Sequence, residues 1–385
     1  MDEQRKPAER AGRGTGIPLG RVAGVPVSLT ASWLVLALLI TITYQGYLTE
    51  RRPGLPTAAA YLVGAGLVLS LLLSVLLHEL GHALTARRFG MGDRGITLEL
   101  LGGYTELDRE APSPRVELVV SLAGPAVSLV LGLAAAAATA VLPPRTLLAE
   151  LAFQLALSNL VVAVFNALPG LPLDGGRALR AGIWAVSRDR HLGDRVAGWV
   201  GRLVAVGSVL LLLLLLAARW ISVFGALLTL MVAVTLWTGA GQAIRAGRLG
   251  PRVPLLNAGR LARPLFPVPA GTPLAEAQRR HAEAAGAGPA VLAVVNSAGH
   301  LVGVVDDTAA AQVPVERRPW ITVDTVARSL DPNRVLPADL GGEALVEAVR
   351  ANPGSEYVVT MGEDVLGVLR VADVVQVLES RGPAR

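Results

Sequence analysis

Long apolar runs without a charged side chain dominate the first 244 residues of this 385-residue chain. Most of them reach the roughly 20 residues that a helix needs to cross the hydrocarbon core of a bilayer. The fifth run is shorter, but the arginines that flank it can extend toward the interface and lengthen it. We therefore predict six transmembrane helices. The runs are 22–49, 53–78, 118–144, 151–173, 203–218 and 220–244.

A different pattern follows Arg263. Two segments rich in β-branched residues, 291–305 and 357–369, each contain a turn signal at the centre and are predicted to form β-hairpins. A helical pattern precedes each hairpin, at 273–285 and at 342–351. This repeat predicts a soluble α/β domain after the membrane domain.

A shorter hairpin is predicted between the second and third apolar runs. Residues 96–107 alternate in polarity, with Gly102 and Gly103 at the expected turn. The hairpin would lie near the membrane. Its strand edge can either plug the helix bundle or accept an extended peptide by strand addition, and the pattern leaves both interpretations open.

The composition agrees with a polytopic membrane protein, because 52% of the residues are hydrophobic and only 17% are charged. The net charge of +5 comes mainly from arginine. No stripe of alternating basic and aromatic residues accompanies this charge, so we do not predict nucleic-acid binding. The chain has no cysteine, which excludes a disulfide framework and a thiolate zinc site.

Arginines are distributed unevenly over the segments that connect the apolar runs. Because short cytoplasmic loops carry an excess of basic residues, the arginine-rich segments predict the cytoplasmic side. Both termini, and the ends of the second and fourth runs, then lie on that side of the cell membrane. The polar N-terminus lacks the apolar core of a signal peptide and is predicted to be disordered. The arginine-rich segments are 5–21, 87–109, 177–195 and 245–263.

The end of the second run carries the residues HELGH, at positions 78–82. Histidines four residues apart lie on one face of a helix, so His78 and His82 can bind a single Zn²⁺. Glu79 beside them can reach a metal-bound water as general base. The alternative is a helix end with two interfacial histidines. With only five histidines in the chain, a chance match is a weak explanation, and we predict a catalytic metal site against the membrane.

A carboxylate occupies an unusual setting at the end of the fourth run. Residues 165–176 read FNALPGLPLDGG, so Asp174 follows an uncharged stretch within a break rich in Pro and Gly. Burying this carboxylate unpaired would be costly, and Zn²⁺ would pair it. Two histidines and one carboxylate leave a fourth position for water, as in catalytic sites. Without the histidines, the break would be interpreted as a simple helix terminator.

Together, the two segments resemble the site-2 protease family of intramembrane zinc metalloproteases. Members carry HExxH on one span and Asn-x-x-Pro-x-x-Pro-x-Asp-Gly on a later one. The resemblance implies that His78, His82 and Asp174 hold the zinc. It also implies that Glu79 is the catalytic acid and base and that Asn166 steadies the substrate or the developing oxyanion. The implied substrate is a transmembrane segment of another protein in the lipid bilayer, such as an anti-sigma factor or a membrane-bound regulator.

Between these motifs the family often shows Ala-Gly-Pro-x-x-Asn. Here residues 123–128 read AGPAVS, with Ser128 at the asparagine position. For Gly124 and Pro125 we predict close helix packing or a kink. Asn159 and Asn166 are seven residues apart and face the same way, and for Asn159 we predict a hydrogen bond between helices.

The C-terminal repeat resembles a tandem pair of CBS domains. The resemblance implies a regulatory module that binds an adenosine nucleotide such as ATP or AMP, or one that serves only structure or homodimerisation. Asp373 falls at the ribose-binding position of the family, whereas Arg370 replaces the expected hydroxyl residue. In the first repeat both expected residues are missing after Gly303.

We therefore predict an α-helical polytopic membrane domain of six spans with a C-terminal cytoplasmic α/β CBS-pair domain, acting as a zinc-dependent intramembrane endopeptidase. The alternative is a zinc-binding transporter or a catalytically silent scaffold with the same ligands. The presence of Glu79 argues against it, because a binding site needs the histidines but no adjacent base. The predicted boundaries are 1–21 for the disordered N-terminus, 22–250 for the protease domain and 264–380 for the CBS domains.

Overall fold

The computed structural model describes residues 16–379, apart from 101, 222, 285–289, 330, 332–333 and 363. The chain forms two compact units, Met1–Arg248 and Leu249–Arg385. Each unit is a separate body with its own hydrophobic core.

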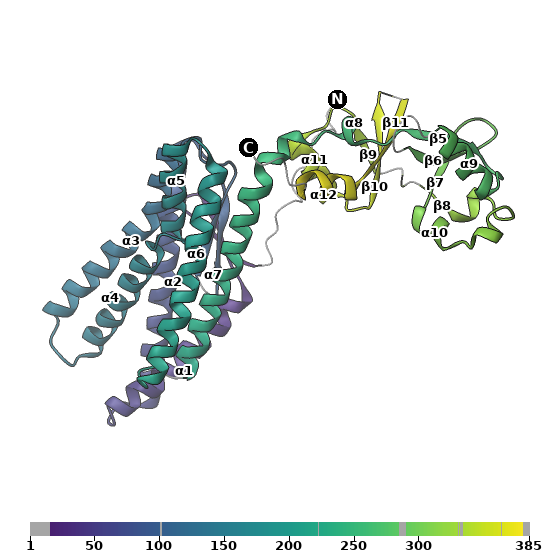
Figure 1. Cartoon of the computed structure of the whole chain (residues 1–385). Helices are drawn as coiled ribbons and strands as arrows, with labels where there is room; N and C mark the ends of the chain where they lie inside the picture. The colour runs from purple at the N-terminus through teal and green to yellow at the C-terminus, as the bar shows by residue number, and fades with distance from the viewer. Residues whose placement is uncertain are drawn as a thin grey trace, which may run out of the picture. The chain divides into compact units, whose positions relative to one another are not determined.

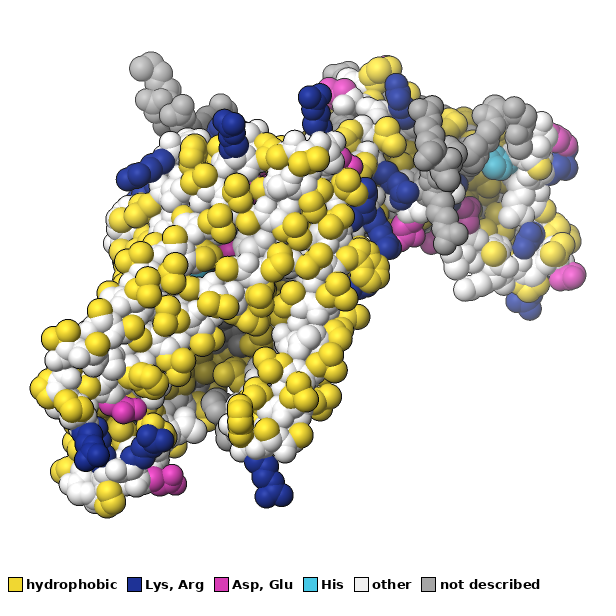
Figure 2. Space-filling view, turned by 60° about the vertical axis from the view of Figure 1, so that its left-hand side comes forward, with side chains coloured by type: hydrophobic (Ala, Val, Ile, Leu, Met, Phe, Trp, Pro, Cys, Tyr) yellow, Lys and Arg dark blue, Asp and Glu magenta, His cyan; other side chains and the backbone are white. Residues whose placement is uncertain are grey.

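Six helices among the described residues are long and apolar enough to cross a membrane, as predicted. Figure 2 shows hydrophobic side chains over the flanks of this helical unit and arginines gathered toward its ends. Outward leucines such as Leu38, Leu62 and Leu203 are more than half exposed, which suits contact with lipid. The helices are α1 (Ala31–Arg51), α2 (Thr57–Arg88), α3 (Pro114–Val141), α4 (Leu147–Asn166), α6 (Arg190–Ala217) and α7 (Val223–Leu249).

The N-terminal prediction is wrong at two points. Residues 17–21, assigned to a disordered tail, belong to strand β1 (Ile17–Val22), while residues 1–15 lie outside the described part of the chain. The first apolar run begins at the last residue of β1 and includes strand β2 (Val25–Leu29), and α1 starts only at Ala31. In β2 every second side chain is buried, and a run without charges does not distinguish such a strand from a helix.

The helix that carries the HELGH residues is longer than its apolar run. α2 continues through His82 to Arg88. Contact with lipid restricts charged residues, but a helix can continue beyond the bilayer, so the end of an apolar run does not mark the end of its helix. α4 ends at Asn166, before Pro169 and Pro172, and a helix that was not predicted, α5 (Asp174–Ser187), begins after the break. Asp174 is therefore the first residue of a helix.

Four strands form one mixed sheet in the order β1-β2-β3-β4, completed by β3 (Asp93–Glu99) and β4 (Gly102–Leu107). β2 and β3 are parallel and the other pairs are antiparallel. The predicted hairpin at 96–107 is present, but its turn falls before Gly102, which pairs with Glu99. The buried face of the sheet packs against Leu80 and Ala83 of α2. β4 is an edge strand beside the polar end of α2.

α2 packs against α1, α3 and β4, and α3 packs against α4 and α5 (Figure 1). The predicted hydrogen bond between helices is present, because Nδ2 of Asn159 in α4 donates to Oγ of Ser74 in α2 at 3.1 Å. The elements that carry the HELGH residues and Asp174 are therefore both held against α3.

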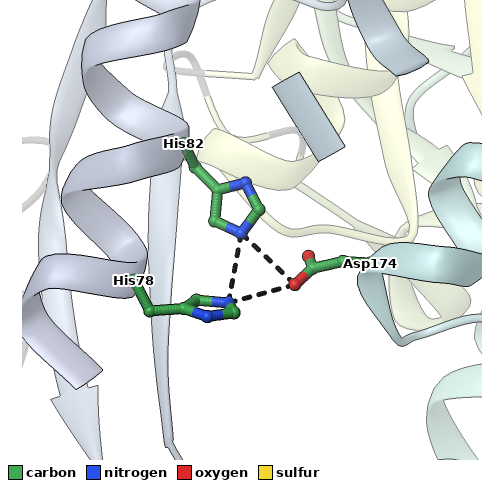
Figure 3. A group of neighbouring side chains, drawn as sticks. All are labelled: His78, His82 and Asp174. Atoms are coloured by element: carbon green, nitrogen blue, oxygen red, sulfur yellow. Dashed lines mark hydrogen bonds and ion pairs between the residues drawn. The ribbon is translucent and has the colours of Figure 1, made fainter. Parts of the chain in front are cut away.

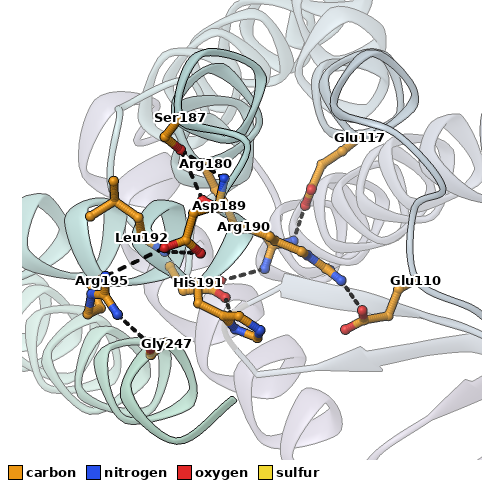
Figure 4. Close-up of polar contacts among 11 residues, drawn as sticks. Glu110, Glu117, Arg180, Ser187, Asp189, Arg190, His191, Leu192, Arg195 and Gly247 are labelled. Carbon is orange, nitrogen blue, oxygen red and sulfur yellow. Dashed lines mark hydrogen bonds and ion pairs between the residues drawn. The ribbon is translucent and has the colours of Figure 1, made fainter. Parts of the chain in front are cut away.

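Buried ion pairs connect α3, α5 and α6 (Figure 4). Arg180 of α5 pairs with Glu117 of α3 and with Asp194 of α6, the latter at 2.9 Å. The Glu117 side chain is only 1% exposed, so removing the arginine would leave a buried charge unpaired. Asp189 caps α6 by accepting a hydrogen bond from the Leu192 backbone N–H at 3.1 Å. This network fixes α5, and Asp174 at its beginning, relative to α3.

The second unit has the predicted α/β arrangement, with one sheet in each repeat. Both predicted hairpins and both helices that precede them are present. One sheet has the order β5-β6-β7-β8 and the other β11-β10-β9. The first half contains β5 (Leu265–Pro269), α9 (Leu274–Ala284), β6 (Val291–Val295), β7 (Leu301–Val305), α10 (Asp307–Gln312) and β8 (Ala327–Arg328). The second contains β9 (Val335–Pro337), α11 (Gly342–Ala351), β10 (Glu356–Met361), β11 (Asp364–Arg370) and α12 (Val371–Glu379).

This unit begins earlier than the predicted residue 264. After α7, the turn η1 (Gly250–Leu255) and helix α8 (Ala258–Leu261) fold onto the second half. Leu256 and Ala258 are buried in the same core as Leu345 and Tyr357. The predicted boundaries left residues 251–263 between the two domains, but the few apolar residues of this segment are sufficient to anchor it.

Candidate active site

His78, His82 and Asp174 converge on one point (Figure 3). Nε2 of His78 lies 3.1 Å from Oδ2 of Asp174, Nε2 of His82 lies 3.3 Å from the same oxygen, and the two nitrogens are 3.3 Å apart. Both histidines are about 5% exposed or less. Three ligand atoms of the expected types thus lie close together in a buried place.

Local backbone geometry brings Asp174 to the histidines. The segment between α4 and α5 is anchored by the Leu171 backbone N–H, which donates to the Ala197 carbonyl of α6 at 3.0 Å. Gly175 and Gly176 lie so close to the backbone of residues 167–171 that a Cβ atom at either position would collide with it. The Pro- and Gly-rich break is therefore a tight turn that only these residues allow.

The second ring nitrogen of each histidine, Nδ1, also has a polar contact. Nδ1 of His82 contacts the Val120 carbonyl at 2.7 Å, and Nδ1 of His78 contacts Oγ of Ser128 at 2.9 Å. Each Nε2 is left to face Asp174, as zinc binding through imidazole requires.

The donor set and the space fit zinc. Two imidazole nitrogens and one carboxylate oxygen are the ligands of catalytic zinc sites, in which water takes the remaining position. A Cβ atom at Gly124 of α3 would lie 2.6 Å from Nε2 of His78 and closer still to Nε2 of His82. The glycine thus keeps open the space in front of both nitrogens.

Glu79 is buried beside this group and has one strong contact. Oγ1 of Thr105 in β4 lies 2.7 Å from Oε2 of Glu79, to which it donates a hydrogen bond. Gly103 of the same strand passes so close that a Cβ atom there would lie 2.9 Å from Cγ of Glu79. The hairpin thus forms one wall of the site.

A cavity of about 580 Å³ adjoins the site within the first unit. Thr105, which contacts Glu79, is among the residues that line it. Charged side chains such as Glu117 and Arg177 line it together with apolar ones such as Met91 and Leu107. The cavity can hold water next to an otherwise apolar bundle.

Asn166 is the last residue of α4 and is half-buried. Among the described residues, no hydrogen bond joins its side chain to the histidines, Glu79 or Asp174. Thr105 and the Val120 carbonyl were not predicted from the sequence, because they come from other elements that only the fold brings to the site. Ser128 was marked only as a departure from the family pattern.

Comparisons with known proteins bear on this site. The family model described as Peptidase family M50 matches residues 66–156 and 144–214, which include HELGH and Asp174. The membrane unit is thus similar to peptidase family M50, the site-2 proteases, and this similarity indicates a metalloprotease.

Curated relatives have names of the same kind. A candidate zinc metalloprotease of Synechocystis, sll0528, is 28% identical over 94% of this chain and 96% of that protein. The candidate zinc metalloprotease Rip3 of Mycobacterium tuberculosis is 38% identical over 52% of this chain, and the match spans 50% of Rip3. Among solved structures, the site-2 protease of Methanocaldococcus jannaschii is 26% identical, covers 60% of this chain and 95% of that one, and gives a TM-score of 0.42.

The C-terminal unit is similar to a different class of solved structure. The CBS domain of a bacterial CNNM/CorC family Mg²⁺ transporter is 15% identical, covers 41% of this chain and 98% of that one, and gives a TM-score of 0.29. In the present chain both carboxylate oxygens of Asp373 accept hydrogen bonds from Arg263, at 2.8 and 2.5 Å. The predicted ribose contact is thus occupied by an ion pair within the unit.

Proposed function

We propose that this protein is a zinc metalloprotease of the site-2 type that cleaves transmembrane segments of other membrane proteins, with zinc held by His78, His82 and Asp174. The observation that carries the proposal is the meeting of these three ligand atoms from α2 and α5, with Glu79 beside them, within an apolar bundle. A membrane-bound regulator or an anti-sigma factor belongs to the class of substrate that such a site would accept.

In this mechanism the bound zinc would supply Lewis acidity to the attacking water and the scissile carbonyl. Glu79 takes a proton from that water and returns it to the amide nitrogen of the leaving peptide. Thr105 holds Oε2 of Glu79 through its hydrogen bond and thereby orients the carboxylate. We assign to Asn166 a donor role toward a substrate carbonyl.

β4 is the proposed docking edge for the substrate. It lies at the edge of its sheet, and its residue Thr105 touches Glu79. A peptide bond inside a helix is shielded from water, so the substrate must unwind near the site. An unwound segment that pairs with β4 would satisfy its backbone hydrogen bonds while it faces the general base.

The proposal requires that HELGH and Asp174 share one side of the membrane, which we take to be the cytoplasmic side, together with both termini. The arginine-rich segments support this arrangement. Reporter fusions after Arg88, Arg190 and Arg252 are expected to report inside, and fusions after Leu48, Leu142 and Ala218 outside. Opposite locations for Arg88 and Arg190 would separate the ligands and refute the shared zinc site.

We further propose that the C-terminal unit regulates the peptidase, either as a nucleotide sensor that uses Asp373 or as a homodimerising module. A nucleotide could change activity only by its differential affinity for two states of the enzyme. It would also compete with Arg263 for Asp373. In calorimetric titrations of the whole chain with ATP and AMP, we expect saturable binding that strengthens in Arg263→Ala and disappears in Asp373→Ala. No binding to the wild type or to Arg263→Ala would leave only the dimerising or structural role.

A further inference from the structure

One face of α3 contacts both histidines of the proposed zinc site. Val120, Gly124 and Ser128 are spaced four residues apart and so form a single stripe along the helix. Val120 contributes its carbonyl to His82, Ser128 its hydroxyl to His78, and Gly124 between them leaves room for both Nε2 atoms.

The two contacts act on the protonation of the rings. A neutral imidazole can bind zinc through Nε2 only when its proton resides on Nδ1. The Val120 carbonyl is an acceptor only, so it selects the tautomer of His82 with the proton on Nδ1. Oγ of Ser128 can accept the corresponding proton of His78, at a donor–acceptor distance of 2.9 Å.

Burial makes the serine hard to replace. Ser128 is 1% exposed and His78 is 5% exposed, so bulk water does not reach this hydrogen bond. Without the hydroxyl, Nδ1 of His78 would be buried without a partner, and the ring would lose the contact that fixes its tautomer and its rotation.

We infer that Ser128 is a positioning residue, which together with the Val120 carbonyl holds both imidazoles in the zinc-binding tautomer. This inference rests on the proposed zinc site. It concerns residues outside the ligand set, and it gives the serine in the AGPAVS segment a defined task.

The test is the zinc affinity of the full-length chain in detergent, measured by competition with a chromophoric chelator. Ser128→Ala is expected to weaken zinc binding by about 10–100-fold. Ser121→Ala is the matched control, because Ser121 is also fully buried in α3 but its hydroxyl donates only within the helix, to the Leu118 carbonyl at 3.0 Å. The control is expected to bind zinc as the wild type does.

A second pair of variants separates hydrogen bonding from packing. Ser128→Thr keeps the hydroxyl. Ser128→Val introduces a side chain of nearly the same shape as threonine but without the hydroxyl. We expect the threonine variant to bind zinc more tightly than the valine variant, by a ratio similar to that between serine and alanine. With zinc added to saturation, Ser128→Ala should recover most of its activity with an unchanged KM, since the residue does not touch the substrate.

The outcomes distinguish this inference from the function on which it rests. Equal zinc affinity in wild type, Ser128→Ala and Ser128→Val, together with loss of zinc in His78→Ala, would overturn the role of Ser128 alone. Wild-type zinc binding in His78→Ala would instead overturn the proposed site itself.

Discussion

Replacing Glu79 with glutamine is expected to lower the cleavage of a transmembrane substrate by at least about 10²–10⁴-fold, while zinc stays bound. Glutamine has nearly the same shape and can still accept the hydrogen bond of Thr105, so the wall of the site should be preserved. It cannot take a proton from water. The three proposed zinc ligands are not changed.

Zinc content and cleavage are measured on the same preparation. Glu106→Gln is the matched control, because Glu106 lies next to Thr105 on β4 but its side chain is 56% exposed. It should behave as the wild type. Full activity in Glu79→Gln would remove the general base from the mechanism and with it the protease chemistry assigned to this site.

The second large effect is expected from a single added methyl group. Gly124→Ala leaves every proposed ligand intact, but its Cβ atom would intrude on the space in front of both imidazoles, 2.6 Å from Nε2 of His78. The rings or α3 must move, and a functional site tolerates misplacement of only about 0.5 Å. We therefore expect zinc binding to fall by more than about tenfold, and cleavage to fall with it.

Gly66→Ala serves as the control for this substitution. Gly66 is also in the interior of a membrane helix, but a Cβ atom there would meet nothing within 4 Å. Its zinc content should be unchanged, because the added methyl group disturbs no neighbour. If Gly124→Ala retained full zinc and activity, the metal would not lie in front of the two histidines.

The sequence was sufficient to predict the parts of this protein that depend on local spacing. HELGH fixes two imidazoles on one helix face whatever surrounds them, and Asp174 was conspicuous as a charge in an apolar setting. The hairpins of the C-terminal unit were predicted for the same reason, because alternation and turn residues are local signals.

The remainder depends on contacts between distant segments. Thr105 and Ser128 are ordinary hydroxyl residues in the sequence, and only the packing of β4 and α3 against α2 brings them to Glu79 and His78. Gly124 was expected to allow close packing of helices, but the space that it leaves faces the Nε2 atoms of both histidines. Asp373 was assigned to a ligand from its position in the CBS pattern, and its partner Arg263, which is far away in the sequence, was not predicted.

The most direct test of the central claim is to map the cleavage of a single-span substrate in lipid vesicles while zinc is measured in the same samples. The account predicts that the wild type binds about one zinc per chain and cuts within the transmembrane segment. Asp174→Ala should lose the metal and the cut together. Retention of zinc and of the same cleavage in Asp174→Ala would contradict the account.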